Sequence, residues 1–263
     1  MAGNKSYPFT RALNMIKFFR KIRQNLLSEG KTGQYMKYAI GEIALVVVGI
    51  LIALSINNWN ENNKIENKKQ LLVLNLIEDF KENKILLESA IKYSETLMLK
   101  MDTFFEKAYS DNLKISLDSL HKLSDGFFRP TNFFPLTTSY DEAKANGNLT
   151  LLHNKELSQN FTEFQRNFNA YLGFKDQGLN SFFSGSVWEL KKTIGSLDYI
   201  RGEKRIFTKK YLDENEYKEL INTPLVIATL ENRYTLKKNE RGALKRMEIN
   251  TEMILKNLEL LKK

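Results

Sequence analysis

The sequence predicts a mainly α-helical protein in which one transmembrane helix continues into a periplasmic helical bundle. The first observation behind this fold class is an apolar stretch over residues 38–56, YAIGEIALVVVGILIALSI, in which Glu42 is the single charged residue. The second is that apolar residues recur every three or four positions in the segments that follow, which is the period of a helix. The third is the scarcity of helix-breaking residues, with 4 prolines and 13 glycines in 263 residues.

Composition narrows the classes of protein that remain. An apolar fraction of 42% is enough to fill a core, which argues against a fully disordered chain. The absence of cysteine excludes a disulfide scaffold, cysteine-ligated zinc, iron–sulfur clusters and a thiol nucleophile. Two histidines, His121 and His153, leave little for a histidine metal site. We therefore predict no metal and no cofactor.

A positively charged region precedes the apolar stretch. Residues 1–37 contain eight basic residues and one acidic residue, whereas the rest of the chain carries 32 basic and 30 acidic residues. A basic tail of this kind suits either nucleic acid or a membrane surface. Because an apolar stretch follows it, we predict the anionic inner leaflet of a lipid bilayer as its partner and no nucleic acid.

The apolar stretch has the length and the flanks of a membrane span. A spanning helix needs about 20 mostly apolar residues, and Tyr35 and Tyr38 on one side and Trp59 on the other suit the aromatic belts at the two interfaces. The alternatives are a buried helix of a soluble core and a cleaved signal peptide. Both are disfavoured, because the basic flank lies on one side only and NNWNENN follows in place of a cleavage site.

Three regions follow from this assignment. We predict a basic amphipathic cytoplasmic segment at residues 1–37, a transmembrane helix at 38–58 and a periplasmic helical domain at 59–263. The orientation rests on the positive-inside rule, which keeps the basic flank in the cytoplasm. In a bacterium with two membranes, the protein then lies in the inner membrane.

Three features refine the membrane assignment. Residues 12–28 form an amphipathic pattern that suits a helix lying on the inner leaflet, or else a solvated helix on a partner, and its cationic residues are Lys17, Arg20, Lys21 and Arg23. Within the span, Gly41, Gly49 and Ala53 share a face that allows close helix packing and oligomerisation. Glu42 is an ionisable group inside the span and thus a functional candidate, although it could also reach the nearby interface or meet Lys37 or a tail arginine.

Met15–Glu61 reads MIKFFRKIRQNLLSEGKTGQYMKYAIGEIALVVVGILIALSINNWNE. This stretch resembles the N-terminal signature of an uncharacterised family of single-span membrane proteins that is abundant in Bacteroidetes, especially flavobacteria. A looser resemblance covers Ser139–Phe161, where Ala143 replaces the family's usual leucine. Family members usually start at the position of Met15, which implies that residues 1–14 are an extension. The resemblance implies location and topology, and it carries no activity and no catalytic residue.

Helical periodicity organises the remainder of the chain. A stalk helix is predicted to continue from the span, with a polar break at Asn83 and apolar residues at Leu72, Leu76, Phe80, Leu87, Ala90, Leu97, Met101 and Phe104. Further helices are predicted at 116–124 with Ser116 as cap, at 139–146 with Gly147 as stop, from the cap Asn154 through Trp188 toward Leu190, and from the cap Thr223 and Pro224 to about Lys262.

Two segments have a different character. Residues 195–213 are predicted to be a loop or a short hairpin. The segment GFFRPTNFFPLTT, residues 126–138, is predicted to fold back over the core, with an exposed contact to a partner or membrane as the alternative.

The sequence contains no nucleotide-binding glycine motif, no HExxH, no GxSxG and no EF-hand loop. The carboxylates Glu78, Asp79 and Glu82 lie among lysines and are interpreted as a solvated face. We therefore predict no catalytic, cofactor-binding or metal residues and no enzymatic activity. The favoured function is a membrane-anchored accessory or scaffold protein that self-assembles or binds an envelope partner. The alternative is a periplasmic ligand or stress sensor that signals through a partner protein.

Overall fold

The computed structural model describes Arg20, Lys21, Gln24 and residues 32–110, 115–194, 197–201 and 212–262. The chain divides into two compact units, Met1–Asn67 and Lys68–Lys263. Every regular element in the described ranges is a helix, which confirms the predicted mainly α fold class. Helix α2, Thr32–Ala108, contains the apolar stretch and continues without a break through Asn83, as predicted for a span that runs on into a stalk helix. Asn83 interrupts only the apolar pattern of that helix.

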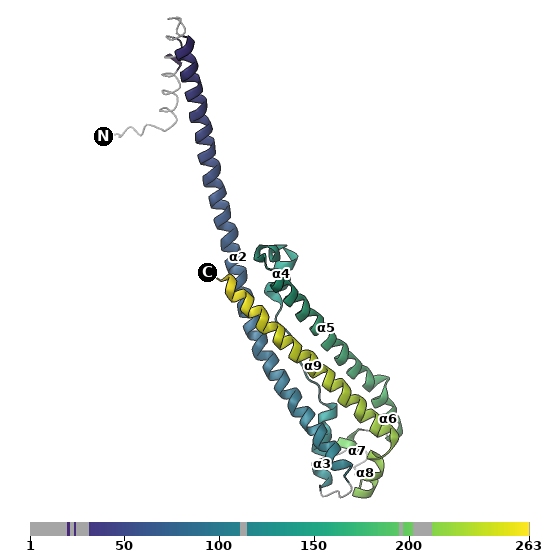
Figure 1. Ribbon diagram of the computed structural model, residues 1–263. Coiled ribbons are helices and arrows are strands. Elements are labelled where there is room, and N and C mark those ends of the chain that lie inside the picture. Colours follow the sequence, from purple (N-terminus) through teal and green to yellow (C-terminus); the bar gives the residue numbers. More distant parts are fainter. Residues whose placement is uncertain are drawn as a thin grey trace, which may run out of the picture. The chain divides into compact units, whose positions relative to one another are not determined.

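The second unit is a helical bundle (Figure 1). Among the described residues, α2 is followed by α3 (Leu117–Phe128), α4 (Thr138–Ala145), the 3₁₀ helix η1 (Asn148–Leu152), α5 (Lys155–Phe183), α6 (Ser186–Ile194), α7 (Asp198–Arg201), α8 (Glu214–Ile221) and α9 (Pro224–Leu261). The long helices are α5, α9 and the part of α2 that lies in this unit.

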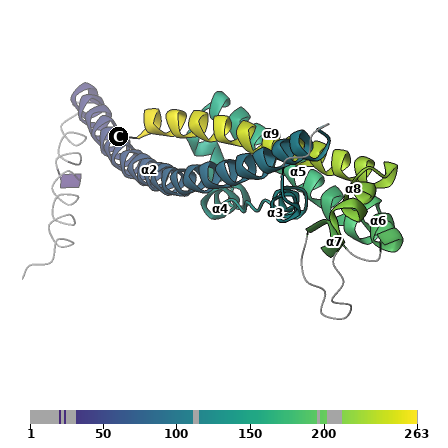
Figure 2. The same ribbon diagram turned by 90° about the horizontal axis from the view of Figure 1, so that it is seen from below.

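These three long helices run side by side, as both views of the bundle show (Figures 1 and 2). Helix α9 is antiparallel to the other two, because residues further along α9 pair with residues progressively earlier in α2 and α5. The polar pairs that set this order are Gln70–Leu261, Lys84–Glu252 and Glu95–Lys245 between α2 and α9, and Asn154–Asn257, Asn167–Asn250 and Gly178–Arg233 between α5 and α9.

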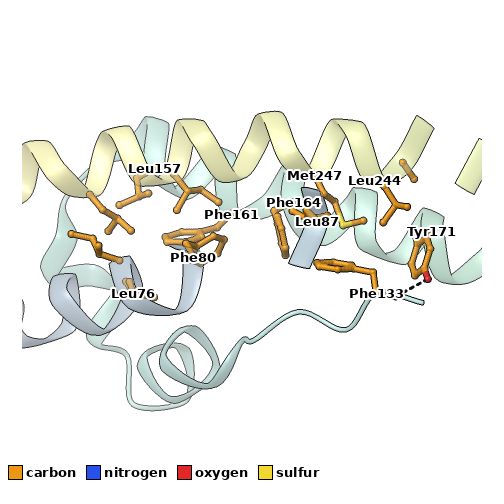
Figure 3. Close-up of a cluster of buried hydrophobic side chains, with 14 of the residues drawn as sticks. Leu76, Phe80, Leu87, Phe133, Leu157, Phe161, Phe164, Tyr171, Leu244 and Met247 are labelled. Carbon is orange, nitrogen blue, oxygen red and sulfur yellow. Dashed lines mark hydrogen bonds between the residues drawn. The ribbon is translucent and has the colours of Figure 1, made fainter. Parts of the chain in front are cut away.

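Two apolar clusters fill the bundle. In the first, the Phe80 ring lies between Phe161 and Phe164, with ring centroids 5.5 and 5.4 Å away (Figure 3). The second cluster, around Phe127 and Tyr217, joins the end of α2 to α3, α6, α7, α8 and the start of α9. The α5 aromatic residues Phe161, Phe164 and Tyr171 are buried and therefore belong to the core. Burying one such side chain contributes about 1.5–3 kcal/mol.

Local sequence signals explain most helix ends. Ser116 and Asn154 cap α3 and α5 through their side chains, as predicted. Asp213 forms a capping box with Glu216 at the start of α8, which satisfies two backbone N–H groups at once. Gly147 follows α4 with φ +70°, a left-handed conformation that glycine adopts without strain.

Three predictions agree only in part with the structure. The helix predicted to run through Trp188 ends at Phe183, and α6 starts separately, because the chain turns sharply at Gly185, where a Cβ would lie 2.9 Å from the Ser181 Cα. Helix α9 begins at Pro224 with Thr223 at the N-cap position, as predicted, but the Thr223 side chain does not cap it, since its hydroxyl donates to the Leu220 carbonyl at 2.8 Å. The predicted loop or hairpin contains the short helix α7, while residues 202–211 lie outside the described residues.

Candidate functional site

The apolar part of α2 is the first candidate. One helix in the described chain is long and apolar enough to cross a membrane, with a mean hydropathy of 2.6 over an 18-residue window in which no residue is buried. Between Ile40 and Ile56, eleven aliphatic side chains are 47–74% exposed. Such a continuous apolar surface far exceeds the scattered apolar residues that ordinary soluble surfaces carry.

The residues predicted to interact with the membrane lie as follows. Tyr38 and Trp59 are exposed at the two ends of the apolar stretch, and Glu42 is exposed one turn inside it. Gly41 and Gly49 have no atom within 4 Å of the position that a Cβ would take, and Ala53 is exposed on the same face. Within the described chain, this face is therefore accessible to a second helix.

The basic segment is described only in part. Arg20 and Lys21 are helical and exposed. Lys17 and Arg23 lie outside the described residues, as does the side chain of Tyr35. The amphipathic helix predicted over residues 12–28 stays a prediction.

The second candidate lies inside the bundle and begins with the segment between α3 and α4, residues 129–137. The amide of Asn83 donates to the Leu136 carbonyl at 2.8 Å and accepts from the Leu136 N–H at 2.7 Å. The Tyr171 hydroxyl accepts from the Phe133 N–H at 3.0 Å (Figure 3). The same hydroxyl donates to the Thr131 carbonyl at 2.8 Å. Two buried side chains, one on α2 and one on α5, thus hold this segment against the core.

The structure confirms that residues 126–138 fold over the core and changes the role assigned to Asp79. Phe127, Phe128 and Phe133 are buried, as expected for a segment that folds over the core, whereas Phe134 is 68% exposed. Asp79 was assigned to a solvated acidic face, but its carboxylate accepts from the Ser139 N–H at 3.0 Å. Asp79 thus caps α4 from the neighbouring helix α2. Its negative charge is favoured there because the N-terminus of a helix carries a partial positive charge.

Three charged side chains of α9 are buried at the centre of the bundle: Arg233, Lys237 and Glu240, at 3%, 2% and 3% exposure. Lys237 Nζ donates to Glu240 Oε2 at 2.7 Å, so these two groups form an ion pair. Burial lowers the pKa of Lys237, while the carboxylate of Glu240 acts in the opposite direction. The pair leaves the positive charge of Arg233 without a carboxylate partner among the described residues.

Arg233 is held by neutral groups. Its Nε donates to the Phe127 carbonyl at 2.9 Å, and Nη1 donates to the Gly178 carbonyl at 3.0 Å. The guanidinium carbon lies 5.1 Å from the centroid of the Phe182 ring, a cation–π arrangement. Gly178 makes this approach possible, because a Cβ there would lie 3.0 Å from Nη1. Burial lowers the pKa of Arg233, yet guanidinium groups stay charged in proteins.

A cavity of about 310 Å³ adjoins these three side chains. Its volume falls at the lower end of the range for small-molecule sites. The walls combine apolar surface with polar groups from α5, α6, α9 and the 129–137 segment. The lining residues include Phe128, Thr131, Lys175, Phe182, Lys191 and the buried charges of α9.

The two histidines contribute to neither candidate. The His121 ring packs edge-on against Tyr217, with centroids 4.9 Å apart. His153 is exposed and ends η1 with φ +43°. Within the described residues, no three His, Asp or Glu side chains are grouped so that they could hold a metal ion.

Comparison with known proteins places the chain in a family. Residues 42–193 match the model of a family of unknown function, DUF6090. The chain belongs to this family. The match starts inside the apolar stretch of this DUF6090 protein and includes Asn83, Thr131, Tyr171 and Gly178, whereas α9 lies beyond it. No curated protein and no solved structure matches the chain.

Sequence reasoning missed the buried charges of α9, although a signal for them exists. The 3-4 spacing recognised from Leu244 onward continues toward the N-terminus, and every position of it is buried: Val226, Leu230, Arg233, Lys237, Glu240, Leu244, Met247, Thr251, Ile254 and Leu258. Three consecutive positions of this seam carry charge. Charged residues at core positions of a heptad mark either a register device or a binding site.

Proposed function

We propose that this protein is a non-enzymatic accessory or scaffold protein. It is anchored in the inner membrane by residues 38–58 and presents the helical bundle on the periplasmic side to a second copy or to an envelope partner. The observation that carries the proposal is the exposed apolar surface between Ile40 and Ile56. Eleven exposed aliphatic side chains, at about 1.5–3 kcal/mol each for full burial, make contact with lipid or with other helices strongly favourable.

The charge pattern supports the orientation. Eight basic residues precede the apolar stretch, and the positive-inside rule keeps such a flank in the cytoplasm. The test is a C-terminal alkaline phosphatase fusion, which is active only after export. We expect an active fusion, and an inactive one would contradict the proposed topology.

The small-residue face supports self-association. The open space at Gly41 and Gly49 lets a second helix approach closely, and tight packing is the main source of helix association in lipid. Gly49→Ile should weaken crosslinking in native membranes. Val47→Phe is the matched control, since it adds bulk on the opposite face of the same helix. If crosslinking is strong in both variants, this face is not the contact.

A second candidate function is a sensor whose bundle binds a small molecule and signals through a partner. The cavity beside Arg233 favours it over a purely structural role. Copurification from native membranes separates the two. A stoichiometric protein partner with no dependence on small molecules supports the scaffold, whereas a retained small molecule supports the sensor.

A further inference from the structure

We propose that the cavity beside Arg233 is a binding site for a small organic carboxylate with an apolar body. The site goes beyond the anchoring role proposed above and does not depend on it. Nothing in the family assignment names a ligand.

The buried charges do not balance. Arg233 and Lys237 carry two positive charges against the single negative charge of Glu240, and all three are at least 97% buried. Lys175 and Lys191, both half-buried, add further positive charge to the lining. A buried charge without a partner is costly, so an anion that enters the cavity is favoured over a cation or a neutral molecule.

Hydrogen-bond donors remain available in the lining. The hydroxyl of Thr131, whose side chain is 1% exposed, has no hydrogen-bond partner within the described residues. The hydrogen bonds that Arg233 makes with the described residues come from Nε and Nη1, which leaves Nη2 free to donate to a ligand. Lys237 Nζ uses one of its three N–H donors in the hydrogen bond to Glu240, and two donors remain. These donors suit the two oxygens of a carboxylate.

The apolar part of the lining determines what the rest of the ligand, beyond its carboxylate, should be. Phe128 and Phe182 form walls, and Leu179 and Phe183, at 48% and 75% exposure, lie among the lining residues that reach solvent. The volume of about 310 Å³ equals that of about ten water molecules, which leaves room for an aromatic ring or a short alkyl chain beyond the carboxylate. An inorganic anion alone would leave these apolar walls uncovered.

The test uses the full-length protein in detergent micelles and a matched set of probes. These are 4-(trifluoromethyl)benzoate, the corresponding neutral benzamide and the corresponding cationic benzylamine, observed by fluorine NMR. We expect the carboxylate to bind with a dissociation constant of about 1 mM or lower, as a fragment of this size allows. The amide and the amine should bind at least about fivefold more weakly. Empty micelles measure partitioning of each probe.

Variants locate the site. Lys237→Met should weaken carboxylate binding about tenfold or more, whereas Lys238→Met, at an exposed neighbouring position on α9, should leave it unchanged. Because Lys237→Met leaves Glu240 unpaired and can unfold the bundle, Thr131→Val and Lys191→Met provide a second route. Thr131→Val removes one hydroxyl at constant shape and should weaken binding about fivefold.

Several results would overturn the proposal. One is equal binding of all three probes, which would show that charge does not select the ligand. Another is no binding of the carboxylate to folded protein at about 10 mM, far above the expected constant. A third is unchanged affinity in both Thr131→Val and Lys191→Met, which would place the carboxylate elsewhere. None of these results bears on the membrane topology, which the fusion experiment tests separately.

Discussion

Asn83→Ala tests whether the 129–137 segment is held by α2. The wild-type side chain is fully buried and makes two hydrogen bonds, of 2.8 and 2.7 Å, with the backbone of Leu136. Each such bond contributes about 1 kcal/mol, and backbone groups left without partners add to the loss. Alanine recovers about 0.5 kcal/mol through its higher helix propensity. The net destabilisation is therefore about 2 kcal/mol.

The assay is thermal unfolding of the full-length protein in detergent, followed by circular dichroism at 222 nm. For a domain of this size, 1 kcal/mol corresponds to about 2–4 °C in Tm, so Asn83→Ala should lower Tm by about 4–8 °C. Asn75→Ala is the matched control, because Asn75 is exposed on the same helix and shares the gain in helix propensity. If the two variants have equal Tm, the hydrogen bonds to Leu136 do not hold the segment.

Three further predictions concern the same bundle. Gly126→Ala should destabilise it by about 1–3 kcal/mol in denaturant titrations, since a Cβ would lie 2.7 Å from the Leu97 carbonyl oxygen; wild-type stability would refute this contact. Burial raises the pKa of Tyr109 and Tyr171 to about 12, above the value near 10 of an unfolded chain. The folded state thus keeps protons that the unfolded state releases, so stability present below pH 10 should decline toward pH 12, and tyrosinate absorbance that rises fully near pH 10 in folded protein would contradict it. Asp213→Ala removes a capping box and should cost about 1 kcal/mol, with hydrogen exchange faster in α8 and unchanged in α5.

Much of the fold could be predicted from the sequence because its signals are local. Helical periodicity, the caps Ser116 and Asn154 and the stop at Gly147 depend on residues within one or two turns. The apolar stretch of α2 is likewise a property of composition and length. Such features survive whatever tertiary structure surrounds them.

The candidate cavity could not be predicted, because its parts are distant in sequence. The pairing of Asn83 with Leu136 spans 53 residues, and that of Arg233 with Gly178 spans 55. In sequence, Arg233, Lys237 and Glu240 resemble an exposed charged face, since many solvated helices carry charges three and four residues apart. Only the apolar positions on both sides of them show that this face points inward.

The buried charges of α9 also restrict how the helices can slide. A seam made of aliphatic residues alone presents nearly the same surface after a shift of one heptad, and mispaired registers then differ little in free energy. In α9, such a shift would move Arg233 away from the carbonyls of Phe127 and Gly178 and bring charge against leucine and methionine. We therefore expect the charged positions to select a single axial alignment of α9, at some cost in overall stability.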